Sequence, residues 1–292
     1  MGTDSKLDHV PSADRVMRRA PYIIHDLPQK ELDRHKTRED LYCWVFGYAL
    51  LQNVVGDGIT RLSQKVREAG KEMAVYEVNY HATKPEETLE TRNEIVTSLA
   101  GGVNLANSML GMMKRHYVRT QCFFNFMGGF GKTRLWGGVI NTRHDNRRYR
   151  PTWLGVMLAT QVIDGDLVET VHTGKSPEFV AIGQIGRRWG KTSRREFDAL
   201  YSYAFRKGQG RGLILVNLEL SSSQDVIVTF EGTAAGPAQR WLLSGDSLVA
   251  NNELEQPKPQ ATIKQDRIEG FRSGYRLTLP PHSMTALRWQ TR

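Results

Sequence analysis

The sequence has few of the residues that build metal sites and disulfide frameworks. It contains two cysteines, Cys43 in LYCWVF and Cys122 in TQCFFNF, where a free cysteine usually behaves as a small buried hydrophobe. No CxxC pair occurs, and the eight histidines never take the HExxH spacing. We therefore expect no disulfide, no bound metal and no cofactor.

Long apolar runs are also missing. No stretch of about 18 apolar residues exists to span a bilayer, and the N-terminus, MGTDSKLDHV, lacks the apolar core of a signal peptide. We therefore expect no membrane partner and no export signal in this chain. A longer form that starts upstream could still be secreted or periplasmic.

The net charge of +9 raises the question of nucleic acid, but the arginines are scattered. The densest groups, at 141–150 and 186–196, belong to no nucleic-acid module that we recognise. Solvated loops are the simpler interpretation, and we expect no nucleic-acid partner.

Residues 1–165 alternate between helix and strand signals. This alternation is typical of an α/β arrangement with a parallel sheet. In order, the patterns predict a strand at 20–28, helices at 38–55 and 58–70, a strand ending at Glu77, a helix at 93–115, a strand at 117–126 and a helix at 150–163.

From about Asp166 the pattern changes to short alternating runs separated by Gly, Ser, Asn and Pro. Such runs are the marks of an antiparallel β-sandwich, which we place at 166–292. The runs are 166–173, 199–208, 211–220, 224–232, 238–245, 261–271 and 275–290.

Three motifs are misleading. FMGGFGKT and IGRRWGKT lack the first glycine of a phosphate-binding loop at the required position. The glycines of SLAGGVNLANS lie inside a helical pattern, where close helix packing explains them better than a dinucleotide fingerprint. The nucleophile motif GxSxG does not occur.

The stretch EMAVYEVNYHAT, 72–83, is an apolar strand that ends in hydrogen-bonding side chains. In (β/α) barrels, catalytic groups lie at the C-terminal ends of the parallel strands. Glu77 closes this strand, and Asn79 and His81 would point to the same side, so Glu77 could be one of the two carboxylates of a glycosidase. A surface glutamate paired with a lysine is the plain alternative.

The next predicted strand also ends in polar and aromatic groups, among them Asn125. Trp136 follows in a glycine-rich loop, and an aromatic face there could stack on a sugar ring. Ordinary core packing is the alternative for the phenylalanines of this strand.

Four segments together resemble part of an α-L-arabinofuranosidase. VYEVNYHAT, the helix that begins LAGGVNLANS, LWGGVINTR and RPTWLGVMLATQVI look like the seventh and eighth strands and helices of the retaining glycoside hydrolases of the large (β/α)8 clan. LPPHSMTAL resembles the last sandwich strand of arabinofuranosidases and β-xylosidases of that clan. The resemblance implies the C-terminal part of a (β/α)8 barrel at 1–165 and a β-sandwich at 166–292.

The resemblance also implies roles for particular residues. Glu77 matches the clan's nucleophile at the end of the seventh strand, in an enzyme acting on plant or microbial oligo- or polysaccharide. Asn79, Tyr80 and His81 would hold sugar hydroxyls or orient the carboxylate, and His25 could donate to Glu77 if its strand is the clan's sixth.

The clan's acid/base, a glutamate preceded by asparagine, has no obvious match. Asn93–Glu94 is expected to open a helix, and Asn252–Glu253 lies in a polar loop. Only one or two strands fit before Glu77, whereas a whole barrel takes roughly 250 residues. The chain is therefore expected to be a glycosidase only when completed by its missing half.

Unpaired sheet edges in half a barrel favour a homo-oligomer. A second interpretation is a non-catalytic carbohydrate-binding or structural module, with Trp136, Trp153, Trp189 and Trp241 as stacking or core residues.

Overall fold

The computed structural model describes residues 35–79, 89–127, 134, 137–141, 147–183 and 193–292. Within these ranges, no helix is long and apolar enough to cross a membrane. The strand expected at 20–28 lies outside them.

The first helical segment matches its prediction. Helix α3, Arg38–Leu50, continues as one π-helical turn, Leu51–Val55, and Thr37 caps its N-terminus by accepting a hydrogen bond from Asp40 N. Nine of its thirteen residues are buried, so α3 runs through the core rather than over the surface.

Helix α4, Asp57–Glu68, is amphipathic instead and ends as the sequence predicts. Gly70 takes a left-handed conformation, with φ at +65°, just beyond the last turn. Lys65 and Arg67 lie in that turn, where positive charge stabilises the negative end of the helix dipole.

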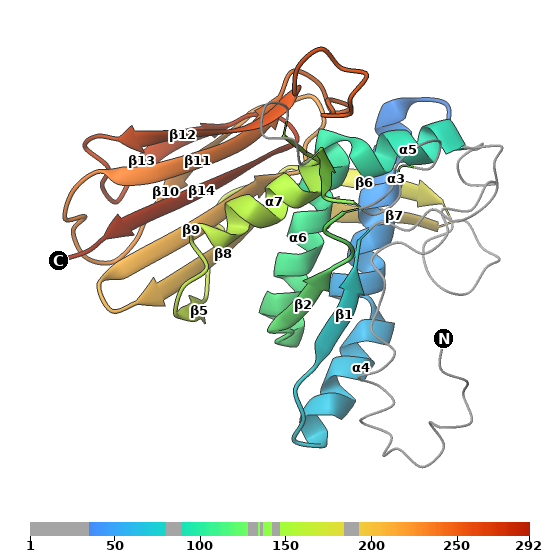
Figure 1. Ribbon diagram of the computed structural model, residues 1–292. Helices are drawn as coiled ribbons and strands as arrows, with labels where there is room; N and C mark the ends of the chain where they lie inside the picture. Colours follow the sequence, from blue (N-terminus) through green and yellow to red (C-terminus); the bar gives the residue numbers. More distant parts are fainter. Residues whose placement is uncertain (1–34, 80–88, 128–133, 135–136, 142–146, 184–192) are drawn as a thin grey trace.

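Strands β1, Ala74–Val78, and β2, Thr120–Phe123, pair in parallel, as the α/β pattern predicts. They lie beside α4 and α6 (Figure 1). Val75 and Val78 are buried in the main core. The first strand runs one residue past Glu77.

The single helix predicted at 93–115 is wrong, because the chain forms two helices there. Helix α5 is Leu89–Thr97 and α6 is Leu99–His116. Between them Ser98 is extended, and its Oγ accepts a hydrogen bond from Gly101 N. A serine favours this capping position because its hydroxyl satisfies an N–H that a new helix leaves unpaired. Asn93 and Glu94 therefore lie inside α5 rather than at a helix start.

Helix α7, Pro151–Thr160, begins with proline, as predicted, and packs closely on α6. A Cβ at Gly102 would lie 2.3 Å from the carbonyl carbon of Pro151, and one at Gly155 would lie 2.9 Å from the Cβ of Ala106. The close helix packing expected of the SLAGG glycines is thus confirmed for Gly102.

Six strands form the largest sheet, and every neighbouring pair is antiparallel. Five of them fall within runs that the sequence predicts, and β9 begins one residue before its run, which starts at 211. In sheet order they are β12, Ala261–Ile268; β11, Ala238–Gly245; β14, Ser283–Gln290; β9, Gly210–Asn217; β8, Leu200–Lys207; and β5, Asp166–Val168.

Both faces of this sheet are covered. Along β9, Ile214 and Val216 join the core shared with the helices, whereas Leu213 and Leu215 join a second core. The second core lies under a two-stranded sheet made of β10, Gln224–Val228, and β13, Tyr275–Leu279. In Figure 1, α6 and α7 lie between the large sheet and the β1–β2 pair.

Two short antiparallel pairs were not predicted. Strands β6, Glu178–Gly183, and β7, Ser193–Asp198, pack on α3, where Phe179 contacts Phe46 and Phe197. Strands β3, Val139–Asn141, and β4, Arg148–Tyr149, join the region after β2 to the start of α7.

Candidate functional site

The C-terminal end of the β1–β2 pair carries Glu77 on an irregular piece of strand. Val75 pairs with Gln121 and Val78 with Phe123, so β1 has one residue more than β2 in this interval. Such a bulge bends the strand and changes where its side chains point, and bulges are common next to active sites. Glu77 is half-buried, and the neighbouring Tyr76 is 59% exposed.

Asn79 ties the two strands together just beyond the bulge. Its Nδ2 donates to the carbonyl oxygen of Phe124 at 2.6 Å, and Phe124 N donates to Val78 O at 3.0 Å. The side chain of Asn79 is buried. It therefore fixes the end of β2 beside Glu77.

Asn125 comes next along the chain and is half-buried. Its backbone oxygen accepts from Gly138 N at 3.1 Å. Its side-chain oxygen is buried and has no hydrogen-bond partner among the described residues. Buried polar atoms without a partner are rare in folded proteins, so this oxygen marks Asn125 as a residue to test.

Aromatic side chains flank the same end of β2. The rings of Phe123 and Phe126 meet Trp153 of α7 edge to face, at centroid distances of 5.1 and 5.3 Å. Phe126 is 53% exposed. A Cβ at Gly138 would lie 2.8 Å from the Cβ of Trp153, so only glycine allows this close approach. The sequence did not single out Phe126.

Of the predicted site residues, Glu77, Asn79 and Asn125 come from adjoining strand ends. The other four lie outside the described residues: His25, Tyr80, His81 and Trp136. Among the described residues, no group of three or more histidine, cysteine, aspartate or glutamate side chains could hold a metal ion.

The cysteine prediction is half right. Cys43 is partly buried, and burial raises the pKa of its thiol to about 12. Cys122, by contrast, is exposed on β2, so the expectation of a buried hydrophobe is wrong there. The edge position of β2 explains the difference, since half of its residues face away from the core.

The solvated loop expected around 141–150 is also corrected. Arg148 and Arg150 are buried, and both bond to the loop between β11 and β12. That loop contains the second Asn–Glu pair. Glu253 accepts hydrogen bonds from Arg150 and Arg134.

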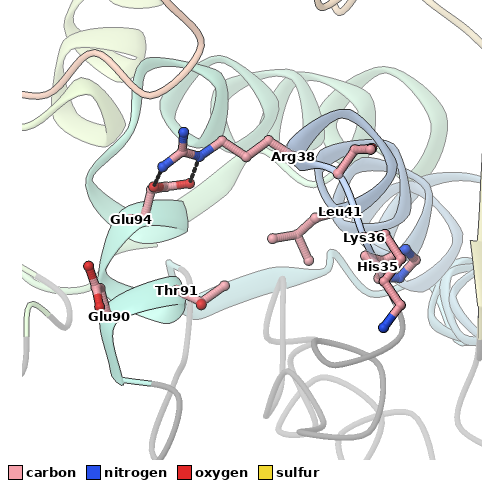
Figure 2. A pocket seen from close by; sticks show the side chains of 8 residues that line it. His35, Lys36, Arg38, Leu41, Glu90, Thr91 and Glu94 are labelled. Carbon is pink, nitrogen blue, oxygen red and sulfur yellow. Dashed lines mark hydrogen bonds and ion pairs between the residues drawn. The ribbon is translucent and has the colours of Figure 1, made fainter.

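Both residues of the first Asn–Glu pair, Asn93 and Glu94, are also hydrogen-bonded to arginines. Glu94 forms a two-bonded ion pair with Arg38, at 3.1 Å from Nε and 2.9 Å from Nη2. Figure 2 shows this pair at the rim of a pocket of about 260 Å³ between α5 and the start of α3. Asn93 accepts from Arg134 N.

Neither a family model nor a curated protein matches the sequence, but solved structures match the fold. An α-L-arabinofuranosidase from Thermotoga maritima matches with a TM-score of 0.64 and 16% identity, over 87% of this chain and 50% of that one. A GH51 arabinofuranosidase from Xanthomonas axonopodis pv. citri gives 0.58 and 20%, over 84% and 48%. A family 51 α-L-arabinofuranosidase from Bifidobacterium longum gives 0.56 and 15%, over 91% and 52%.

The fold of this chain is therefore like that of solved α-L-arabinofuranosidases. More particularly, its fold is like that of family 51 α-L-arabinofuranosidases, as the sequence resemblance predicts. It spans about half the length of those structures.

Proposed function

We propose that this chain carries the nucleophile of a retaining glycoside hydrolase that cleaves α-L-arabinofuranosides or β-xylosides in plant or microbial polysaccharide. The observation that carries the proposal is the position of Glu77, half-buried on a bulge at the C-terminal end of a parallel strand. Catalytic carboxylates of barrel enzymes come from such strand ends. The arabinofuranosidase-like fold supports it.

In this proposal, β1 and β2 are the last two strands of a (β/α)8 barrel within 1–165, and 166–292 is the β-sandwich that follows it. The Glu77 carboxylate attacks the anomeric carbon, and the bond from that carbon to the leaving oxygen breaks. Water then hydrolyses the glycosyl ester and releases the sugar with its configuration retained. Asn79 holds the strand end, and Asn125 offers its amide oxygen to a sugar hydroxyl.

The acid/base must come from elsewhere. A retaining pair needs a second carboxyl group about 5–5.5 Å from the nucleophile. Glu94 and Glu253, the two glutamates preceded by asparagine, are held in ion pairs with arginines. We place the acid/base on the strands that complete the barrel, and infer that the chain pairs through its sheet edges with a second copy or with the missing half.

Covalent trapping tests the nucleophile without needing the acid. A dinitrophenyl 2-deoxy-2-fluoro-arabinofuranoside and the matching xyloside have leaving groups that depart without protonation. We expect the intact mass of the chain to rise by one fluoroglycosyl group, located on Glu77 by peptide mapping. Glu77→Gln should abolish the addition.

The matched control is Glu72→Gln. Glu72 precedes the same strand and, among the described residues, pairs with Arg119 in an exposed ion pair at 3.6 Å. This variant should be trapped like the wild type. A wild-type chain that is never labelled, alone or with its completing half, would rule out the proposed reaction.

A carbohydrate-binding module remains the second candidate, since Phe126 and Trp153 form a partly exposed aromatic pair beside Asn125. Trp241 is buried, which makes it a core residue rather than a stacking one. Binding to arabinoxylan that is equal in wild type and Glu77→Gln, with no trapping of either, would favour the module.

A further inference from the structure

A buried carboxylate far from Glu77 in sequence is linked to the proposed site. Glu253 lies in the loop between β11 and β12, with its side chain 8% exposed. Its Oε1 accepts from Arg150 Nε at 2.6 Å, and its Oε2 accepts from Arg150 Nη2 at 3.1 Å and from Arg134 Nη1 at 2.5 Å. A carboxylate that accepts hydrogen bonds from three charged donors is held firmly in place.

The loop that carries Glu253 is itself fixed. Arg148 donates to the carbonyl oxygens of Glu253 and Gln256 at 2.8 and 2.7 Å. Asn252 donates to Tyr149 O at 2.8 Å, and its oxygen accepts from Ala261 N at 2.9 Å. The carboxylate is thus held from the side of the large sheet.

Arg150 carries that constraint toward the end of β2. The residue precedes α7 and its side chain is 2% exposed. Its Nη1 donates to Gly137 O at 2.9 Å, and its backbone N donates to Gly138 O at 2.8 Å.

The segment held by Arg150 in turn holds the site. Gly138 N donates to Asn125 O at 3.1 Å, and Val139 N donates to Phe126 O at 2.9 Å. Asn125 and Phe126 follow Phe124, whose carbonyl oxygen is bonded to Asn79. Hydrogen bonds joined by short backbone segments, at 137–139 and 124–126, therefore lead from Glu253 to the strand end beside Glu77.

We propose that Glu253 is a positioning residue for the proposed site. Acting through Arg150, it sets the place of residues 137–139 and hence of Asn125 and Phe126 relative to Glu77. A buried ion pair is a poor source of net stability but a strict geometric constraint, because both charges need their partners. This role rests on the proposed function.

Glu253→Gln tests the role, because it keeps the shape and removes the charge. Amide hydrogen exchange at Gly138 and Val139 is the first measurement, and the rate of trapping at Glu77 is the second. We expect exchange at both amides to speed up at least tenfold. Trapping should slow at least tenfold at saturating reagent with little change in the half-saturating concentration, since a misplacement of about 1 Å can cost 10²-fold.

Arg150→Lys is the second variant. It retains the positive charge but loses the planar fork that reaches both carboxylate oxygens and Gly137 O, so it should behave like Glu253→Gln. Because it leaves a charge opposite Glu253, it also serves if Glu253→Gln does not fold.

Asp266→Asn is the matched control. Asp266 forms the same two-bonded pair with Arg240, at 2.8 and 2.5 Å, but on the exposed part of β11 and β12. Its loss should change neither measurement.

The two measurements separate the possible failures. Unchanged exchange at Gly138 and Val139 in both Glu253→Gln and Arg150→Lys would overturn the positioning role, whether or not the chain is an enzyme. Faster exchange with wild-type trapping would also overturn it. If the wild type is not trapped at all, the proposed function fails, and the exchange rates alone show whether Glu253 orders the segment.

Discussion

Residues 35–160 and 166–292 differ in how their strands pair and in how their sheets are covered. In the second region, the strands of the large sheet have antiparallel neighbours, and both faces of that sheet are packed. The first region has the parallel pair β1–β2 and the short antiparallel pair β3–β4, and it is bonded to the second region. Leu99 N and Ala100 N, at the start of α6, donate to Ala250 O and Leu248 O. The comparison teaches that the first region is bonded to the loop that joins two strands of the large sheet, β11 and β12.

The largest expected effect tests whether the two regions unfold together. Leu105 of α6 and Leu287 of β14 are both fully buried, one in each core. Replacing either by alanine should cost about 2–5 kcal/mol of the free energy of unfolding. Because helices and sheet share the main core, we expect both variants to shift one common transition in urea, followed by circular dichroism and tryptophan fluorescence.

Leu254→Ala is the control for these variants, since Leu254 is 52% exposed and its loss should change stability by less than about 0.5 kcal/mol. Separate transitions, with Leu105→Ala moving only one of them, would show that the regions fold independently.

A smaller effect tests the contact between α6 and α7. Gly102→Ala places a Cβ 2.3 Å from backbone atoms of Pro151 and should destabilise the fold by about 1–3 kcal/mol. Gly58→Ala in α4 meets nothing within 4 Å and should be neutral or stabilise by up to about 1 kcal/mol. Urea midpoints of the two variants should move in opposite directions; equal shifts would show that α6 can move away from α7.

The smallest expected effect is on the pH dependence of stability, to which one buried histidine in each region contributes. Burial lowers the pKa of His116 and of His282, whose ring nitrogens bond to Val54 O and Leu220 O. Since the unfolded pKa is about 6.5, the unfolded chain takes up protons first, and stability falls as pH drops through 6.5. Each histidine adds at most about 1.4 kcal/mol per pH unit.

The measurement is the urea midpoint at pH 7.5 and 5.5. His116→Gln and His282→Gln should each weaken the pH dependence, and a loss confined to one variant would show which region sets it. Wild-type stability that rises on acidification would contradict both assignments.

The sequence predicted the large sheet well because alternation is a local pattern. Its strands match predicted runs, and only β9 begins outside its run, by one residue. Strand β7 was not predicted because its segment, SRREFD, is mostly charged. It buries chiefly Phe197, against β6 and α3, which lie elsewhere in the chain. The helix break at Ser98 had a local signal, the capping serine, that an apolar run obscured.

The site was only partly predictable for the same reason. Glu77 was found because it follows an apolar strand, but the bulge beneath it depends on pairing with Gln121 and Phe123 some 45 residues later. The burial of Arg150 depends on Glu253, 103 residues away. No local pattern in NTRHDNRRYR shows which arginine faces solvent.

The two packed faces of the large sheet have a consequence for the fidelity of strand alignment. A sheet with one polar face resists slippage, because moving a strand by one residue exchanges its buried and exposed side chains. Strand β9 loses that protection, since residues 213–216 are apolar on both faces. Asn217, the last residue of β9, is a buried polar residue. Its Nδ2 donates to Pro280 O and Leu279 O, and its Oδ1 accepts from Glu219 N. A shift of β9 by one residue would break these bonds, so the buried amide of Asn217 fixes the alignment of the strand.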